Sequence, residues 1–314
     1  MDKSTNHIQI SAKELLLKNK GCLEEVESSN IGFYYFTTIH TAEKILATDT
    51  GNYIFVSPIS IMNDLHEREL HSSNGSSIFG LCFCNSDMDN IPMWYLYAGI
   101  SGQGARIGIT AKKMYNFISN IEYVYAVDKM QIGRRLERGK DFDLEYGWIF
   151  YRQDKDCIKY RNQYFTLTDS LLSFEHENYL VKDIEWKYEK EFRLVFHLKG
   201  NPPERIAVPL DKKALVKSGG LSVMLAPELR PRINEKVKAE EYAKRLGIPS
   251  EKVKFSKLKI KMDLVSRNQY TIIEKFSDVL NNLNQRDVEN VCKQMQSRQF
   301  CARSKAESEE LSYV

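Results

Sequence analysis

Glu189, Glu191 and Arg193 lie two residues apart at the start of an apolar run. In a β-strand, side chains two residues apart project from the same face. A strand here would carry two carboxylates and a guanidinium in one row, with Phe192 and Leu194 on the opposite face. Two neighbouring carboxylates repel, so that one titrates high enough to act as an acid or base while the other stays ionised. The row is typical of a catalytic carboxylate site.

The same row also has a purely structural interpretation. Charged side chains are mostly exposed in folded proteins. An arginine and a glutamate on a solvated strand face commonly form an ion pair that contributes little to stability. The segment by itself therefore leaves two interpretations open, a carboxylate site and a solvated, ion-paired strand face.

A second polar group follows Pro58, where Asn63, Asp64, His66 and Glu67 fall in a loop between two apolar runs. Loops of this kind often carry functional residues. An Asn-Asp pair is also a common turn or helix cap, so this group has a structural explanation as well.

Aromatic residues gather in two places, at Tyr34 and Tyr35 and again at Trp94, Tyr95 and Tyr97. Exposed aromatic side chains can stack on a nicotinamide or adenine ring and donate a hydrogen bond from the rim. Packing in the core is the more frequent explanation for any single one of them.

The sequence gives no support for several other kinds of site. Gly102, Gly104 and Gly108 have the spacing G-x-G-x-x-x-G before a predicted strand, whereas a dinucleotide-binding loop has G-x-G-x-x-G before a helix. No two of the six cysteines have the two-residue gap of a zinc or redox motif. His66 and His71 are five residues apart, which does not place them on one helical face. We therefore expect no metal site.

The apolar pattern predicts an α+β fold, because strands come in runs and helices are inserted irregularly. The predicted strands are 31–38, 53–57, 78–84, 105–110, 123–127, 191–197, 205–209, 221–225 and 252–260. The predicted helices are 9–26, 41–48, 93–99, 166–180, 234–246 and 268–283. Ser11 is the expected N-cap of the first helix.

The chain of 314 residues has a formal net charge of +3 and the composition of an ordinary soluble globular protein. No stretch approaches the roughly 20 apolar residues of a membrane span, so we expect a cytoplasmic protein without membrane contact. Basic residues concentrate in 199–261, where 16 Lys or Arg stand against 7 Asp or Glu. Such a segment can bind the phosphates of a nucleotide or nucleic acid, although a solvated Lys-rich face is the more common case.

Five fragments occur in one order: FYYFTTIHTAEKIL, SPISIMNDLHE, LCFCNSDMDNIPMWYLYAGISGQGARIGI, WKYEKEFRLVF and MLAPELRP. This series resembles the DUF2971 family of uncharacterised bacterial proteins over about residues 31–230. The chain departs from the family at Asn-Asp-Leu-His-Glu, where the family commonly has Asn-Asp-Pro. The resemblance divides the chain into an N-terminal helical extension (1–30), an α+β core domain (31–262) and a C-terminal helical segment with a polar tail (263–314).

The opening strand, helix and strand, and the later Glu-x-Glu strand, are also similar to those of DNA-modifying ADP-ribosyltransferase toxins. This resemblance implies a split, strongly bent β-sheet with peripheral helices and a cleft that takes NAD as substrate. Glu191 would be the catalytic carboxylate beside the ribose 2′-OH, and Glu189 would position the acceptor or tune Glu191. The residues implied for nucleotide binding are Tyr35, Thr37, Asn63, Asp64, Trp94, Tyr97, Arg106 and Arg193.

Two functions follow as expectations. The first is an ADP-ribosyltransferase-like effector of a bacterial toxin or anti-phage system that transfers ADP-ribose from NAD to nucleic acid or protein. The alternative is a non-catalytic module that binds a nucleotide or nucleic acid through the aromatic pocket and segment 199–261. In either case the segment 263–314 could dock a partner protein.

Overall fold

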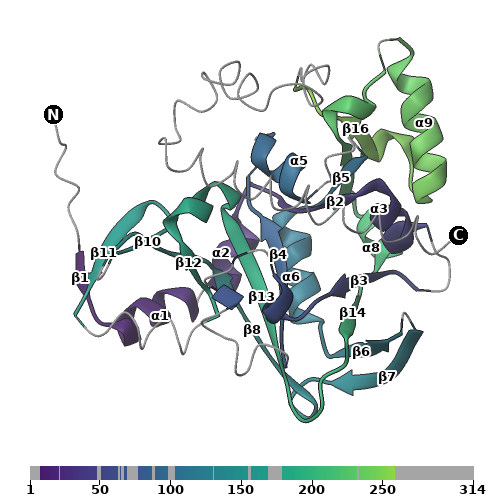
Figure 1. Cartoon of the computed structure of the whole chain (residues 1–314). Helices are drawn as coiled ribbons and strands as arrows, with labels where there is room; N and C mark the ends of the chain where they lie inside the picture. Colours follow the sequence, from purple (N-terminus) through teal and green to yellow (C-terminus); the bar gives the residue numbers. More distant parts are fainter. Residues whose placement is uncertain are drawn as a thin grey trace, which may run out of the picture.

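The computed structural model describes residues 8–20, 22–47, 51–62, 64, 67–68, 77–86, 89–97, 103–129, 131–154, 157–168, 179–231 and 233–258. The predicted helix at 268–283 and the segment 263–314 lie outside these residues. The described part combines helices with three β-sheets of mixed and antiparallel strands (Figure 1). The α+β prediction is therefore confirmed.

The largest sheet has seven strands in the order β16-β15-β5-β2-β4-β13-β8. Their bounds are β2 Phe33–Thr38, β4 Ile78–Cys84, β5 Gly104–Ile109, β8 Phe142–Trp148, β13 Glu191–Leu198, β15 Leu221–Leu225 and β16 Val253–Phe255. β4 and β13 pair along their whole lengths, but β2 and β4 share one residue pair, Tyr34 with Cys84. The two halves of this sheet are thus joined over a very short stretch.

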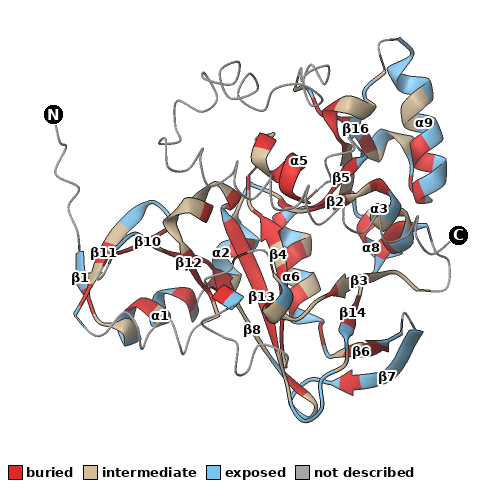
Figure 2. Cartoon of the chain, in the orientation of Figure 1, coloured by how far each residue is buried: buried red, intermediate tan, exposed pale blue. Residues whose placement is uncertain are grey.

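The centre of this sheet is buried on both faces, as Figure 2 shows for β4 and β13. One face of β13 carries Phe192, Leu194 and Phe196, none of which has any exposed surface, and all three belong to the main hydrophobic core. The alternation of these residues with charged ones explains why the strand forms here, since each face meets a different environment.

A second sheet has four antiparallel strands in the order β3-β14-β6-β7. Their bounds are β3 Tyr53–Val56, β6 Tyr123–Asp128, β7 Gln131–Glu137 and β14 Arg205–Pro209. One face, with Ile54, Val124, Ile206 and Val208, is buried in the main core. The opposite face is turned away from that core.

The third sheet has five strands in the order β1-β11-β10-β9-β12. Their bounds are β1 Ile8–Ile10, β9 Phe150–Arg152, β10 Cys157–Tyr160, β11 Gln163–Leu167 and β12 Val181–Asp183. The N-terminal segment takes part in this sheet, because β1 runs parallel to β11. β12 pairs with β9, and the Nζ of its Lys182 lies 3.0 Å from the carboxylate of Glu191 on β13 of the seven-stranded sheet.

Helices surround the sheets. Their bounds are α1 Ala12–Lys20, α2 Cys22–Ser28, α3 Ile39–Leu46, α5 Ile91–Tyr97, α6 Ala111–Ser119, α8 Lys212–Lys217 and α9 Glu235–Leu246. Short 3-10 turns are η1 Ile59–Ile61, η2 Ile184–Glu189, η3 Pro227–Leu229 and η4 Ser250–Lys252. Ser11 caps α1 as predicted: the Glu14 N–H donates to its hydroxyl at 3.3 Å and its own N–H donates to the Glu14 carboxylate at 3.0 Å.

Some predicted elements were wrong. The predicted helix 166–180 begins inside strand β11, because a hairpin at Arg161 (φ 54°) pairs β11 with β10. The predicted single helix 9–26 is instead the strand β1 followed by α1 and α2, and Leu15, Cys22 and Val26 of these helices are fully buried. The sequence analysis also missed α6 and the strands β7 to β10. The predicted strands 78–84, 205–209 and 221–225 coincide with β4, β14 and β15.

Candidate functional site

β13 holds two of the three charged residues of the predicted row. Glu191 and Arg193 pair with β4 in an unbroken register, so their side chains share one face, as predicted. Glu189 is not in the strand. It is the last residue of η2, and Lys190 follows it in the left-handed conformation (φ 44°). The prediction of one strand row was therefore wrong for Glu189, which reaches the same cluster from a 3-10 turn.

Arg193 is fully buried and bonds to two carboxylates. Its Nε donates to Glu191 at 2.6 Å. Its Nη1 donates to Glu67 and, at 2.8 Å, to the backbone carbonyl of Tyr179. The planar guanidinium is suited to this role because its donors lie in a fixed fork. Arg193 therefore fixes the carboxylates of Glu191 and Glu67 relative to each other.

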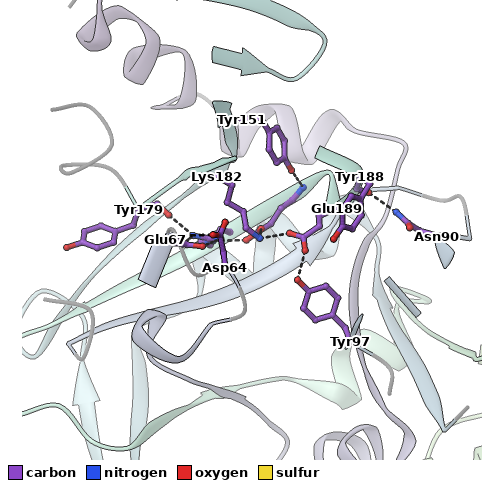
Figure 3. A network of polar contacts seen from close by, with 11 residues as sticks. Asp64, Glu67, Asn90, Tyr97, Tyr151, Tyr179, Lys182, Tyr188 and Glu189 are labelled. Carbon is purple, nitrogen blue, oxygen red and sulfur yellow. Dashed lines mark hydrogen bonds and ion pairs between the residues drawn. The ribbon is translucent and has the colours of Figure 1, made fainter. Parts of the chain in front are cut away.

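Lys182 is the second cation of the cluster. Its Nζ lies 2.5 Å from the Glu189 carboxylate and 3.0 Å from that of Glu191. Figure 3 shows Glu189 between Lys182 and Tyr97, whose hydroxyl donates to the other carboxylate oxygen of Glu189. The Glu191 N–H donates to the Tyr151 hydroxyl at 2.9 Å. We call Glu67, Lys182, Glu189, Glu191 and Arg193 the carboxylate cluster.

The carboxylate cluster is buried. The exposed fraction is 3% for Glu189, 3% for Glu191, 7% for Lys182 and 0% for Arg193. Removing charges from water is costly unless they are paired and hydrogen-bonded, and breaking such a pair leaves an uncompensated charge. The interpretation of this row as a solvated, ion-paired strand face is therefore wrong.

The surroundings of Glu189 and Glu191 shift their pKa values in opposite directions. Burial raises the pKa of Glu189 to about 7, and the Glu191 carboxylate adds to the rise while Lys182 opposes it. Burial would raise the pKa of Glu191 too, but Arg193 and Lys182 outweigh it and hold that pKa well below its ordinary value. Near neutral pH the cluster thus combines one carboxyl group that can gain or lose a proton with one permanent carboxylate.

Replacing Glu189 with glutamine is expected to stabilise the protein more at pH 8 than at pH 5. Folding raises the pKa of Glu189 from 4.5 to about 7, so the folded protein holds the Glu189 proton more tightly than the unfolded chain does. The stability that this proton contributes is complete below pH 4.5 and is lost as the pH rises through about 7. Glutamine mimics the neutral acid and does not titrate. Urea unfolding between pH 5 and 8 measures the difference, with a slope of at most about 1.4 kcal/mol per pH unit. Exposed Glu240→Gln is the control, and a pH-independent difference for Glu189→Gln would contradict the assignment.

A pocket of about 290 Å³ opens beside the carboxylate cluster. It lies where β2 and β4 separate, and β3, α5 and the residues after η1 complete its walls. Glu189, Glu191 and Lys182 line it, together with the predicted residues Tyr35 and Tyr97. Glu191 and Tyr35, which lie far apart in the sequence, thus line one cavity.

Asp64 also lines this pocket and is 5% exposed. Its Oδ1 accepts a hydrogen bond from the Glu67 N–H at 3.2 Å. Its buried Oδ2 has no hydrogen-bond partner among the described residues. An unsatisfied buried carboxylate oxygen is costly, and a ligand hydroxyl or amide that donated to it would remove that cost.

Arg106 on β5 is a buried cation of a different kind. It is 4% exposed, and its guanidinium carbon lies 4.1 Å from the centre of the Tyr34 ring. Its Nε and Nη1 atoms have no hydrogen-bond partner within the described part of the chain. Gly108 makes this stacking possible, because a Cβ there would lie 2.9 Å from the Tyr34 ring. Arg106 thus has two buried donors without a described partner, and it is not among the residues that line the two pockets.

The other predicted residues lie around the pocket or outside it. Thr37 is buried on β2, but it is not among the residues that line the pocket. Trp94 packs against Phe36, with ring centres 5.0 Å apart, and its indole N–H donates to Asp89 at 3.4 Å. Trp94 thus supports the pocket from behind. Asn63 lies outside the described residues.

Lys182, Tyr151 and Cys82 were not predicted as members of the site, and Glu67 was predicted only as part of a polar loop. The one signal for Lys182 in the sequence is that it directly follows the apolar pair Leu180-Val181. Cys82 lines the pocket next to Glu191, and burial raises the pKa of its thiol well above the ordinary value. The thiol is therefore neutral at physiological pH.

Several basic residues of the segment 199–261 are already paired within the protein. The ammonium group of Lys212 is buried and donates to the backbone carbonyl of Leu46 at 2.6 Å. Further ion pairs are Arg230–Glu235, Lys238–Glu241 and Arg245–Glu43. A phosphate-binding role for this segment stays a prediction.

Among the described residues, no three His, Cys, Asp or Glu side chains are grouped as a metal site would require. None of the described helices has the length and apolar composition to cross a membrane. No protein-family model, no curated protein and no solved structure matches the chain.

Proposed function

We propose that this protein cleaves the nicotinamide–ribose bond of NAD and transfers ADP-ribose to a nucleic acid or protein acceptor. The observation that carries the proposal is the pair Glu189 and Glu191 on the pocket wall, one with a pKa of about 7 and the other held ionised. A pocket of about 290 Å³ is at the small end for ligand sites and suits the nicotinamide riboside half of NAD.

Glu191 is the group that stabilises the transition state. When the bond between the ribose carbon C1′ and nicotinamide breaks, nicotinamide leaves with the bonding electrons and positive charge develops on the sugar. A fixed carboxylate beside the ribose lowers the energy of that charge, because the site excludes water and is already organised. Arg193 and Lys182 hold Glu191 ionised and in place, so they act as positioning residues.

Glu189 is the group that handles the acceptor proton. An acceptor hydroxyl or amine forms a new bond to C1′ and must lose its proton as it does so. The carboxylate form of Glu189 takes that proton, and a base with a pKa near the working pH is the most effective. Tyr97 and Lys182 position Glu189 for this step through their hydrogen bonds.

Arg106 is proposed to bind the phosphates of NAD. Tyr34 and Glu191 lie in one transverse row of the sheet, because both pair with Cys84, and two strand spacings separate them by roughly 10 Å. The guanidinium over Tyr34 is thus about one nucleotide away from the carboxylate. Tyr35 and Asp64 on the pocket wall are then placed for the ribose and the nicotinamide amide.

The fold and the sequence add support of a weaker kind. The single residue pair between β2 and β4 is the type of separation that an ADP-ribosyltransferase-like split sheet would have. The ordered fragments that resemble the DUF2971 family include the strand with Glu189, Glu191 and Arg193. The role as a toxin or anti-phage effector rests on these resemblances alone.

One observation favours the non-catalytic alternative. Both carboxylate oxygens of Glu191 are already engaged, Oε1 by Arg193 and Oε2 by Lys182. A carboxylate so fully paired could serve only to hold the pocket, which would then bind a nucleotide without cleaving it. The two functions differ in whether nicotinamide is released.

Nicotinamide release from NAD by the purified full chain tests the proposal. Wild type is expected to release nicotinamide, and Glu191→Gln is expected to be slower by about 100-fold or more, as for other removed charge-stabilising groups. Glu145→Gln is the matched control, since Glu145 lies on the same sheet face but is 38% exposed in its side chain. Equal release by wild type and Glu191→Gln, at any level, contradicts the catalytic role.

A further inference from the structure

The outer face of the four-stranded sheet carries a set of aromatic rings that the main core does not use. Residues opposite each other in the antiparallel register share a face, which places Phe55, Ala207, Tyr125 and Arg135 in one transverse row. We call the outward residues of this sheet the aromatic face. Its aromatic and charged members are Tyr53, Phe55, Tyr123, Tyr125, Arg135, Glu137 and Arg205.

The rings of the aromatic face pack on one another. The centre of the Tyr125 ring lies 5.6 Å from that of Tyr53 and 5.6 Å from that of Tyr123. Small side chains occupy the middle strand, where Ala207 is fully buried beneath its neighbours. The four aromatic side chains are only partly buried, so ring surface remains open to solvent. The ring planes meet edge to face, at 85° and 84°, and aromatic side chains that project from a sheet can stack on planar groups.

Two arginines and one glutamate give the aromatic face its charge, and the Arg135 Nε lies 3.9 Å from the Glu137 carboxylate. The Arg135 guanidinium carbon lies 3.9 Å above the centre of the Tyr123 ring, and its side chain is 50% exposed. Arg205 is exposed in the next row of the same face. Arg135 lies on β7, which Figure 2 shows as largely exposed. Cations at the edge of stacked rings suit a ligand whose planar bases alternate with phosphates.

The aromatic face is continuous with the pocket. Phe55, on this face, and Ser57, just after β3, line the pocket that holds Glu189 and Glu191. Burial raises the pKa of Tyr35 in that pocket to about 12, and Arg205 opposes the rise, so Arg205 lies within electrostatic reach of the pocket. A chain stacked on the aromatic face would therefore end at the carboxylates.

A second cleft of about 310 Å³ adjoins the far end of the same face. Tyr123 and Pro209 contribute to its wall, and Asn116 of α6 and Asn120, the C-cap of that helix, also line it. Side-chain amides can donate to and accept from the edge of a base. The cleft thus offers a place for one unstacked base beyond the ring platform.

We propose that the aromatic face binds single-stranded nucleic acid and delivers it to the pocket as the ADP-ribose acceptor. The binding part stands on the face alone, and the acceptor part rests on the proposed function. Single strands are favoured over duplexes because stacking on Tyr53, Tyr123 and Tyr125 requires unpaired bases. They are favoured over a protein partner because the face combines its rings with exposed guanidinium groups instead of an apolar patch.

Binding of a fluorescently labelled 12-nucleotide single strand, followed by anisotropy, tests the binding part. Wild type is expected to bind, with affinity that falls as salt rises from 50 to 200 mM. Tyr125→Ala is expected to weaken binding about 5-fold to 100-fold, whereas Tyr125→Phe keeps the ring and should stay within about 2-fold of wild type. Arg135→Gln is expected to weaken binding and to reduce the salt slope by about one.

Arg134→Gln is the matched control for Arg135→Gln. It removes the same charge from the same strand. Both arginines have a carboxylate partner, Asp141 at 3.2 Å for Arg134 and Glu137 at 3.9 Å for Arg135, but Arg134 lies on the alternate face. Three results would each overturn the proposal: no binding at 50 mM salt, equal loss in Arg134→Gln and Arg135→Gln, or equal affinity for a duplex of the same length. Thermal unfolding of each variant identifies any loss that comes from misfolding.

Nicotinamide release by wild type is measured separately, without oligonucleotide. Release with no oligonucleotide binding would overturn the aromatic-face proposal and leave NAD cleavage standing. Oligonucleotide binding that is lost in Tyr125→Ala, together with no nicotinamide release, would contradict the proposed enzyme and leave the binding face standing. The two proposals therefore fail separately.

Discussion

Replacing Arg193 with methionine is expected to lower the free energy of unfolding by about 3–5 kcal/mol. Arg193 has no exposed surface and bonds to both Glu67 and Glu191. Methionine fills much of the same volume, so the loss comes mainly from two buried carboxylates that lose their shared partner. This is one of the largest stability changes that a single substitution in this chain should cause.

Urea unfolding at pH 7 measures this loss. Arg230→Met is the matched control, because Arg230 forms an ion pair with Glu235 at 3.0 Å while both side chains are substantially exposed. Its expected change is below about 1 kcal/mol. Adding Glu67→Gln to Arg193→Met should restore part of the lost stability, because it removes the buried carboxylate that Arg193 pairs with, while Glu191 stays paired with Lys182. Equal effects of Arg193→Met and Arg230→Met would contradict the buried-network description.

Replacing Arg106 with methionine is expected to have the opposite effect on stability and a large effect on ligand binding. Two guanidinium nitrogens of Arg106 are buried without a partner in the described part of the chain. Their removal should raise the free energy of unfolding by about 1–3 kcal/mol. If NAD phosphates are the missing partner, the same change should weaken NAD binding by about 10-fold to 100-fold, the value of charge-assisted hydrogen bonds.

Urea unfolding and NAD titration of one preparation measure the two effects together. Arg106→Lys is the informative comparison, because lysine keeps the charge and loses the two-donor fork. Arg106→Lys should bind NAD more tightly than Arg106→Met does, but it should not show the higher free energy of unfolding expected for Arg106→Met. Unchanged NAD affinity in Arg106→Met would remove Arg106 from the ligand site, whatever its effect on stability.

The strand of the carboxylate cluster was predictable, but the partners of its charges were not. Alternation of Phe192 and Leu194 with charged residues was enough to predict β13 and the shared face of Glu191 and Arg193. The same pattern extended wrongly to Glu189, because the left-handed turn at Lys190 leaves little trace in a non-glycine sequence. Local periodicity cannot report a backbone reversal of that kind.

Long-range pairing accounts for the rest of what sequence reasoning missed. Lys182 reaches the cluster from β12, a three-residue strand in a different sheet, and Glu67 reaches it from the segment after η1, where it is helical. The burial of Arg193 follows from having β4 and β8 on both sides. The lack of a partner for the Nε and Nη1 atoms of Arg106 among the described residues depends on how the surrounding strands pack. Each of these facts is set by tertiary packing and not by neighbours in the chain.

Transfer of radiolabel from NAD tests the central claim most directly. NAD labelled in its adenylate phosphate is incubated with single-stranded nucleic acid and either wild type or Glu191→Gln, and the covalently bound label is measured. Wild type is predicted to attach label to the nucleic acid or to protein, and Glu191→Gln is predicted to attach almost none. Label that stays in intact NAD with wild type, or that is attached equally well by Glu191→Gln, would contradict the account.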